Sequence, residues 1–468
     1  MSEFLTMLDD VMYYPILIIV LLVAGIYFTL RTRFIQGRYL KECIRVVMQK
    51  PTKENAVSSF QALMVSTASR VGTGNIVGIS TALCLGGFGS VFWMWIIAII
   101  GGATAFIEST LAQVYKRRDQ NGDSYGGPAY YIELVLHSKF FASAFAFFLI
   151  TTYAGGFNAL ASYNLQSTFS VYSFYDKVTT PWIIGGILAV LVGYCLIGGG
   201  KRIIHVTEVL VPFMGVLYVI LSLVIIVMHF TMIPSVLSAV FTDAFDFQKI
   251  LGGISGSCMM YGIKRGLYSN EAGVGSAPNA AAAADVSHPA QQGLVQMLSV
   301  FIDTVLCTST ALMCMFSGAI PTKELAGAPY VQEATRMDFG TFGPIMITVA
   351  MVLFAFTTLI GNLYYVNNAL AYLNGKKTPG KTFMTCFRIV CVLVIFVGAG
   401  MSMDNAWALA DITMGFMCLI NVPSIMAMGG TALKVMDDYG KQLDAGVDIP
   451  VFKAKNIGLD ETDLDYWK

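Results

Sequence analysis

The sequence predicts an all-α, polytopic membrane protein with about 11 transmembrane helices, and three observations lead to this prediction. Hydrophobic residues make up 56% of the 468 residues and charged residues only 12%, whereas a soluble domain carries about 25% charged residues. Long apolar stretches follow one another without an intervening soluble domain. Two of these stretches are interrupted by glycine-containing motifs. We therefore treat residues 1–468 as a single membrane domain embedded in the lipid bilayer.

Each candidate span holds about 20 mostly apolar residues, which is the length that crosses a bilayer. In chain order the spans are residues 12–30, 60–85, 91–114, 141–169, 181–197, 206–230, 250–278, 293–317, 345–371, 383–401 and 407–428. Without the first span, an interrupted span heads each of two groups of five. Because five is odd, the groups have opposite orientations in the membrane, as in an inverted repeat. The predicted parts are an extra N-terminal helix (12–30), a first repeat (58–231), a second repeat (250–430) and a tail (436–468).

The charges in the loops predict the orientation of the chain. Most lysines and arginines fall in loops on one side of the membrane, and this side is the cytoplasmic one. The N-terminus is then outside and the tail is cytoplasmic, in a multi-pass protein of the plasma (inner) membrane. The net charge of zero gives no reason to expect nucleic acid as a partner. We expect a monomer.

The first interruption, a Gly-Thr-Gly-Asn motif inside the span 60–85, is predicted to be a binding site. Its unwound turn exposes the N–H groups of Thr73, Gly74 and Asn75 at the start of a half-helix, where they suit a carboxylate. The carbonyl groups of Ala68 and Val71 lose their helical partners and can ligate a hard cation such as sodium. A helix kink without a ligand is the alternative.

Three polar residues inside the span 345–371 are further candidates. Thr357 and Thr358 could complete an oxygen cage for sodium, although a threonine in a membrane helix also bonds back to its own backbone. Asn362 lies one turn after Thr358 on the same face. A buried amide needs a partner, so Asn362 either holds a polar substrate or bridges two helices.

The second interruption is expected around residues 252–256, running on into residues 264–273. Arg70 and Glu271 flank the two interruptions and could pair, either as a structural tie or in coupling. Asp303 is another ionisable residue inside a span. No nucleophile–base pair and no cluster of metal-ligating residues is recognisable in the sequence, so we expect neither an enzyme nor a bound cofactor.

Four longer motifs resemble the alanine or glycine:cation symporter family. They are Ala68–Ile76, Gly126–Glu133, Lys264–Asn279 and Phe354–Asn362, and the resemblance extends over essentially the whole chain. It implies sodium- or proton-coupled uptake of small neutral amino acids through a LeuT-type five-plus-five fold with one extra helix. For the site, it implies a substrate carboxylate at Thr73, Gly74 and Asn75, sodium between Ala68, Val71, Thr357 and Thr358, and carbonyl groups near Gly256 and Met260 for the substrate amine.

The chain departs from this family at several positions. Ala161 and Tyr163 stand where family members often carry glutamine and asparagine, and Val366-Asn367 stands in place of the usual Gly-Glu. If Ala161 lines the pocket, a polar contact is lost and space is gained. Alanine or glycine is the first choice of substrate, and a larger neutral amino acid such as glutamine remains open.

Other modes of action also remain open. Proton coupling through Glu271 or Asp303 is one alternative to sodium coupling. A receptor that binds an amino acid without translocating it is another. A channel would show a repeated filter or rings of charge, and the sequence contains neither.

Overall fold

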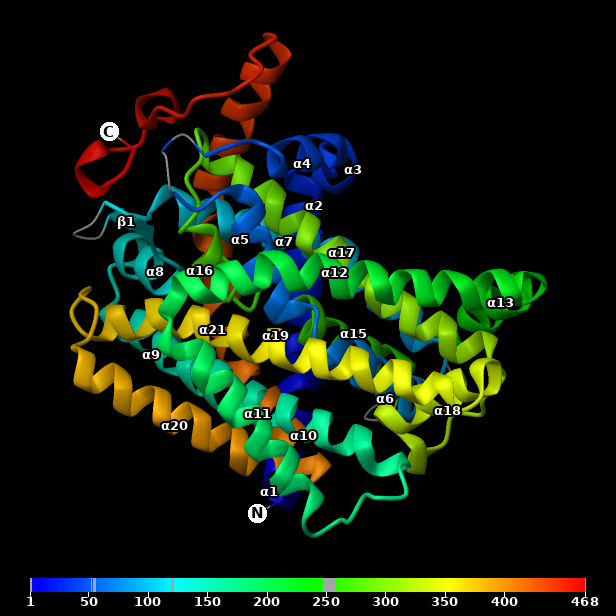
Figure 1. Ribbon diagram of the computed structural model, residues 1–468. Helices are drawn as coiled ribbons and strands as arrows, with labels where there is room; N and C mark the ends of the chain where they lie inside the picture. Colours follow the sequence, from blue (N-terminus) through cyan, green and yellow to red (C-terminus); the bar gives the residue numbers. More distant parts are fainter. Residues whose placement is uncertain (1, 52, 54–55, 119–121, 247–256, 468) are drawn as a thin grey trace.

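The computed structural model describes residues 2–51, 53, 56–118, 122–246 and 257–467, and this part of the chain is mostly helical (Figure 1). Within it, only β1 (Arg117–Arg118) and β2 (Ser124–Tyr125) form a sheet, as an antiparallel pair. The predicted all-α fold class is therefore confirmed.

Eight segments of the described chain are long and apolar enough to cross a membrane, judged by length and composition. They are α7 (Ser90–Val114), the run of α9 (Lys139–Ile150), η3 (Thr151–Gly156), α10 (Phe157–Ser167) and η4 (Thr168–Val171), α11 (Thr180–Ile197), α12 (Gly199–Met228), α17 (Pro289–Phe316), α19 (Phe342–Leu373), α20 (Lys381–Ala399) and α21 (Met403–Asp444). Three predicted spans are missing from this set. One is the N-terminal helix, formed by α1 (Ser2–Val11), η1 (Met12–Leu17) and α2 (Ile18–Arg31), and the others are the two interrupted spans. Counting these three, the structure agrees with the expected number of about 11.

Shorter elements connect the spans. They are α3 (Ile35–Arg38), α4 (Leu40–Val47), α8 (Pro128–Leu136), η5 (Phe230–Met232), α13 (Ile233–Ala244), η7 (Lys323–Leu325), α18 (Ala328–Phe339), η8 (Ala454–Ile457) and η9 (Glu461–Asp463). In Figure 1, α3, α4, β1 and the C-terminal segment lie towards the top and upper left, whereas α13 and α18 lie at the right. These first elements belong to segments that the sequence predicts to be cytoplasmic, and they lie away from α13 and α18.

The first interrupted helix consists of α5 (Ser59–Arg70), η2 (Gly74–Gly78) and α6 (Ile79–Gly86). Ser58 caps α5, because its hydroxyl accepts a hydrogen bond from the N–H of Gln61 while the Gln61 side chain accepts one from the N–H of Ser58. The helix ends where Val71 turns into an extended conformation with ψ 93°. The predicted interruption at residues 70–75 is confirmed.

The second interruption begins at the end of the predicted range, at Glu271. Helix α15 runs unbroken from Cys258 to Asn270, and the chain leaves it at Glu271, whose φ is 52°. Gly273 and Gly275 follow with φ values of 86° and 87°, a conformation that glycine adopts readily. A short helix, α16 (Pro278–Ala281), then begins. The prediction that the break runs through residues 264–270 is wrong, and residues 252–256 lie outside the described residues.

The interrupted helices lie in the middle of the bundle beside α19, whereas α20 lies at its edge (Figure 1). Gly361 of α19 makes this close packing possible. A Cβ atom at Gly361 would lie only 2.8 Å from the backbone nitrogen of Ser69 in α5, so any larger residue would force the helices apart. This contact fixes α19 against the residues that precede the first interruption.

Helix α21 continues to Asp444, so the predicted start of the tail at residue 436 falls inside a helix. Tyr439 is buried in this last part, with its ring 4.9 Å from that of His288. Its hydroxyl donates a hydrogen bond to Glu42 of α4. These contacts extend the buried face of α21 beyond the membrane span, and they stabilise the helix as far as Tyr439.

The C-terminal segment, residues 445–467, folds back onto the ends of the membrane helices. The indole N–H of Trp467 donates to the carbonyl oxygen of Gln113 at 2.7 Å. The hydroxyl of Tyr466 donates to Oδ1 of Asp285 at 2.7 Å. The buried ammonium group of Lys116 lies 3.7 Å from the centre of the Tyr466 ring, as a cation–π contact. Although the C-terminal segment is polar, it is therefore packed against the membrane domain.

Candidate functional site at the first helix interruption

The first interruption directs two backbone donors away from the carbonyl groups that precede it. The N–H of Gly72 donates to Oδ1 of Asn75 at 2.7 Å, and the N–H of Asn75 donates to the carbonyl oxygen of Gly72 at 3.2 Å. In a continuous α-helix these N–H groups would bond to the carbonyl groups of Ala68 and Val71, four residues earlier. Both of these carbonyl groups therefore lose their helical donors.

Thr358 of α19 lies directly against this break. A Cβ atom on Gly72 would lie 1.8 Å from Oγ1 of Thr358. The buried hydroxyl of Thr358 forms no hydrogen bond within the described residues, although a buried polar group without a partner is costly. In contrast, the hydroxyl of Thr357 donates to the carbonyl oxygen of Leu353 at 2.9 Å, within its own helix. The two adjacent threonines thus differ, and only the oxygen of Thr358 is unused at the break.

The second half of the interrupted helix begins with backbone donors. Thr73 and Gly74 stand at its start, where the first N–H groups of a helix have no intrahelical acceptor. Asn75 has a different role from Thr73 and Gly74. Its N–H is bonded to Gly72, and its side-chain amide donates to Oδ1 of Asp303 at 2.7 Å. The structure therefore brings Thr73 and Gly74 together as donors, while Asn75 holds the turn in place.

Asp303 of α17 is a buried carboxylate that connects both interrupted helices. Its Oδ1 accepts hydrogen bonds from the amide of Asn75 and, at 2.8 Å, from the hydroxyl of Ser269 in the last turn of α15. The sulfur of Cys307, one turn further along α17, lies 3.2 Å from the amide nitrogen of Asn75. A movement of either interrupted helix would therefore change the hydrogen bonds of Asp303.

Asn362 bridges two helices at the other side of the break. Its Nδ2 donates to Oδ1 of Asn158 in α10 at 3.0 Å, and its Oδ1 lies 2.7 Å from the hydroxyl oxygen of Ser69. The same hydroxyl lies 3.1 Å from Oε1 of Glu271, whose Oε2 accepts from Ser276 at 2.6 Å. Of the two roles that the sequence left open for Asn362, the structure shows the bridge.

Helix α10 carries buried polar atoms that have no hydrogen bond within the described residues. The side-chain amide of Asn164 donates to Oγ1 of Thr73 at 3.1 Å. Within the described residues, Oδ1 of Asn164, Nδ2 of Asn158 and the hydroxyl of Ser162 are buried without a hydrogen bond. Ala161 is fully buried on the same helix. Sequence reasoning did not select Asn164 as a site residue, although an amide inside an apolar span was a usable signal.

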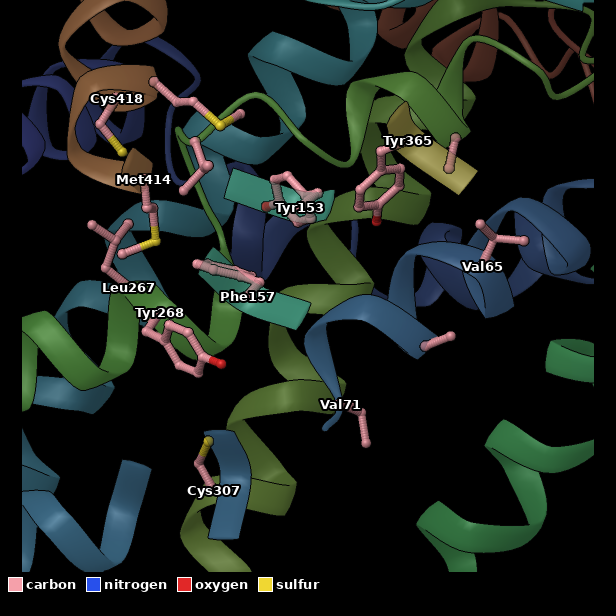
Figure 2. Packing of buried hydrophobic residues seen from close by; sticks show 14 of the residues in the cluster. Val65, Val71, Tyr153, Phe157, Leu267, Tyr268, Cys307, Tyr365, Met414 and Cys418 are labelled. Carbon is pink, nitrogen blue, oxygen red and sulfur yellow. The ribbon is translucent and has the colours of Figure 1, made fainter. Parts of the chain in front are cut away.

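Aromatic rings surround the start of the second half-helix. A Cβ atom on Gly74 would lie 2.6 Å from the ring of Tyr268, so this glycine allows the ring to approach the backbone. The ring centres of Phe157 and Trp407 lie 4.7 Å and 4.9 Å from that of Tyr268. Figure 2 shows Tyr268 and Phe157 close to the end of α5 at Val71. These rings come from three helices that are distant in the sequence, so no local pattern predicts that they meet here.

Other predicted residues lie outside this cluster. Gly256 is outside the described residues. Met260 is buried at the beginning of α15, almost three turns before that helix ends, so the interruption does not free its carbonyl group. The guanidinium of Arg70 donates to the carbonyl oxygen of Gln296 at 3.2 Å. Within the described residues, the expected ion pair between Arg70 and Glu271 is not formed, since the carboxylate of Glu271 bonds to serine hydroxyls instead.

Comparisons with known proteins find relatives over nearly the whole chain. The model of the sodium:alanine symporter family matches residues 1–454. The amino-acid carrier protein AlsT of Bacillus subtilis (strain 168) is 40% identical over 439 residues, which cover 94% of this chain and 92% of that protein. The probable sodium/glutamine symporter GlnT of the same strain is 39% identical over 462 residues, which cover 98% of this chain and 94% of that protein.

Among solved structures, the chain is similar to the crystal structure of MhsT in complex with L-phenylalanine. The TM-score is 0.54 at 14% sequence identity, and the match covers 88% of this chain and 97% of that one. An identity this low concerns the fold alone, and it supports the LeuT-type helical membrane fold that the sequence predicted. With a family match over residues 1–454 and full-length relatives near 40% identity, the chain belongs to the sodium:alanine symporter family.

Proposed function

We propose that the chain couples the inward movement of sodium to the uptake of a small neutral amino acid by alternating access. Members of its family are symporters, so the chain is a membrane transporter and not an enzyme. The observation that carries the proposal is the break at Gly72: the carbonyl groups of Ala68 and Val71 lose their helical donors there, and the hydroxyl of Thr358, which has no hydrogen bond within the described residues, lies against Gly72. Oxygen ligands of this kind suit a hard cation.

Sodium is a cargo in this proposal, and Thr358 is its side-chain ligand. Bound sodium would hold the end of α5 against α19 and so order the start of the second half-helix, where the amino acid binds. Sodium and amino acid then favour each other's binding, and this coupling is reciprocal. Thr357, also predicted as a ligand, has less support, because its hydroxyl is bonded within α19.

The amino acid is proposed to bind with its carboxylate at the N–H groups of Thr73 and Gly74. A helix N-terminus favours negative charge through its free donors and its dipole. The unpartnered Oδ1 of Asn164 lies on the residue that contacts Thr73, and it is an acceptor for the substrate amine. This assignment takes the place of Met260. Gly256 stays a prediction.

Alanine or glycine is the proposed substrate, and glutamine is the second candidate. The family description supports alanine, and the relative GlnT is named for glutamine. Ala161 on α10 bears on the choice, because a small side chain there leaves room for a longer substrate. Phe157, one turn before Ala161 on α10, packs against the ring of Tyr268, and these two rings limit that room.

The proposal is tested by uptake of labelled alanine, glycine and glutamine into proteoliposomes, with and without an inward sodium gradient. We expect accumulation of one of them, driven by the gradient and collapsed by a sodium ionophore. Equal uptake with and without sodium would contradict the proposal. Binding without accumulation would point to a receptor.

A second candidate is proton coupling, favoured by the position of Asp303 between the two interrupted helices. The variant Asp303→Asn distinguishes proton coupling from sodium coupling. An amide at this position keeps Oδ1 as an acceptor for Asn75 and Ser269, so we expect sodium-driven uptake to stay within about fivefold, the equivalent of one ordinary hydrogen bond. If a pH gradient alone drives uptake in the unmodified protein and not in Asp303→Asn, the coupling ion is a proton.

The remaining assignments are also proposals. The protein lies in the cell membrane with its N-terminus outside and its C-terminal segment in the cytoplasm, and it acts as a monomer. The excess of lysine and arginine on the side of α4, β1 and the C-terminal segment supports this orientation (Figure 1).

A further inference from the structure

A second cavity, separate from the first interruption, has a strongly basic lining. It has a volume of about 1090 Å³ and lies between the β1–β2 ribbon, the end of α19 and the start of α20. Five of its lining residues are cations (Arg118, Lys376, Lys377, Lys381 and Arg388), and one is an acid (Asp123). We call it the basic cavity. None of its residues takes part in the site proposed for sodium and the amino acid.

The cations of the basic cavity are only partly neutralised by the protein. Lys376 forms an ion pair with Glu133 at 2.9 Å. Arg118 stacks on the ring of Tyr466, with 4.6 Å between the guanidinium carbon and the ring centre. Within the described residues, Lys377, Lys381 and Arg388 form no ion pair. Three cations that form no ion pair in the described part of the chain therefore line one cavity, together with the carboxylate of Asp123.

Arg388 is the most informative of these cations. It lies seven residues after Lys381, the first residue of α20, and seven residues make two turns, so both side chains are on the same face of the helix. Arg388 is thus about 10 Å further into the span than the helix start. A charged residue inside a membrane span needs a partner, and by default it marks a functional site.

The surroundings of α20 indicate an amphiphilic ligand. Another part of the surface of this helix exposes large apolar side chains, namely Phe383, Ile389, Val390, Leu393 and Val397, so the helix lies at the lipid boundary of the bundle (Figure 1). A small adjoining cavity shares Met384 and Arg388 with the basic cavity and is otherwise lined largely by apolar residues such as Phe387 and Leu196. Along α20, the basic lining at the start of the helix is therefore followed by an apolar lining further into the span.

We propose that the basic cavity binds the phosphate headgroup of an anionic phospholipid, with its acyl chains along α20. Lys377 and Lys381 meet the phosphate at the level of the helix start, and Arg388 reaches it from within the span. The N-terminus of α20, capped by Gly380, adds backbone donors that favour an anion. Basic pockets between membrane helices are known to hold lipid headgroups of this kind.

The bound lipid would contact residues that join the two halves of the protein. Asn368 of α19 lines the basic cavity, and its side-chain amide donates to the carbonyl oxygen of Gly126 at 2.9 Å and to that of Asn279 at 3.1 Å. Asn279 belongs to α16, directly after the second interruption. Occupation of the basic cavity therefore acts on the same helices that transport must move.

The test uses the full-length protein in detergent and counts retained lipids by native mass spectrometry after mixing with phosphatidylglycerol or phosphatidylcholine. We expect tight retention of one phosphatidylglycerol. The triple variant Lys377→Gln, Lys381→Gln, Arg388→Gln should lose about 100-fold in affinity for phosphatidylglycerol, since each cation near a membrane surface contributes about fivefold. Arg388→Lys, which keeps the charge, should retain the lipid and shows that the position itself tolerates change.

A matched control removes the same charge elsewhere. Lys41, Lys434 and Lys441 are exposed on α4 and α21, outside the basic cavity, and their triple replacement by glutamine should leave phosphatidylglycerol binding unchanged. An equal loss in both triple variants, or no preference for phosphatidylglycerol over phosphatidylcholine, would overturn the proposal. So would displacement of the lipid by equimolar glycerol 3-phosphate, because the ligand would then be a soluble phosphate.

Discussion

Gly72→Ala is expected to remove most sodium-driven uptake. The new methyl group would lie 1.8 Å from Oγ1 and 3.1 Å from Cβ of Thr358, so Thr358 or the break must shift. Overpacking of this kind costs about 1–3 kcal/mol, and each 1.4 kcal/mol is a factor of ten. We expect a loss of about 10- to 100-fold in the initial rate of uptake, measured in proteoliposomes at equal protein content.

Gly78→Ala is the matched control for this variant. It makes the same chemical change in the same interrupted helix, but a Cβ atom at Gly78 would meet only the side chains of Trp407 and Arg265, at 3.7 Å and 3.9 Å. These are ordinary van der Waals distances, so we expect nearly unchanged uptake. If both alanine variants transport equally well, the close contact between Gly72 and Thr358 has no role in the site.

Thr358→Val is expected to raise the sodium concentration for half-maximal uptake by about 10- to 100-fold. Hydrogen bonds and similar contacts to a charged group are worth about 1.5–3 kcal/mol, and valine keeps the shape of the side chain while removing the oxygen. Because the hydroxyl has no hydrogen-bond partner in the described chain, its removal should not lower the amount of folded protein. The measurement is the sodium dependence of alanine uptake, together with protein abundance in the membrane.

Thr357→Val provides the comparison. This hydroxyl bonds to the carbonyl oxygen of Leu353 in its own helix, so its loss should change sodium dependence by much less than the neighbouring substitution. A larger effect at position 357 than at 358 would mean that α19 turns its other face to the ion. Unchanged sodium dependence in both variants would remove α19 from the sodium site.

The two interruptions show which parts of the fold a sequence can predict. The first was predicted correctly because its cause is local: Gly72 and Gly74 stand close together inside an apolar span. The second was predicted to run through residues 264–273, but residues 264–270, with the cations Lys264 and Arg265, are helical and the break begins at Glu271. In the structure both cations reach Asp411 of α21 at 3.2 Å, so the helix continues through them. No local pattern reveals a partner about 150 residues away.

The candidate site has the same division between local and distant causes. The sequence identified the adjacent hydroxyls of Thr357 and Thr358, but not which one faces the break. That choice depends on how α19 is rotated against α5, and the contact of Gly361 with Ser69 sets this rotation. Asn164 was overlooked for the same reason, since its importance comes from a hydrogen bond to Thr73 in another helix.

The docked C-terminal segment has a consequence for the order in which the chain assembles. Trp467 and Gln113 are 354 residues apart, yet the indole N–H satisfies a carbonyl group at the end of α7. Likewise, Lys116 can form its cation–π contact with the ring of Tyr466 only after that segment has been synthesised. Residues 466 and 467 follow the last membrane span in the chain, and contacts between residues far apart in the sequence are slow to form. The end of α7 therefore lacks these contacts while the later spans enter the membrane. Docking of residues 466 and 467 is therefore a closing step of folding, and protease resistance of this segment would report that the whole bundle has formed.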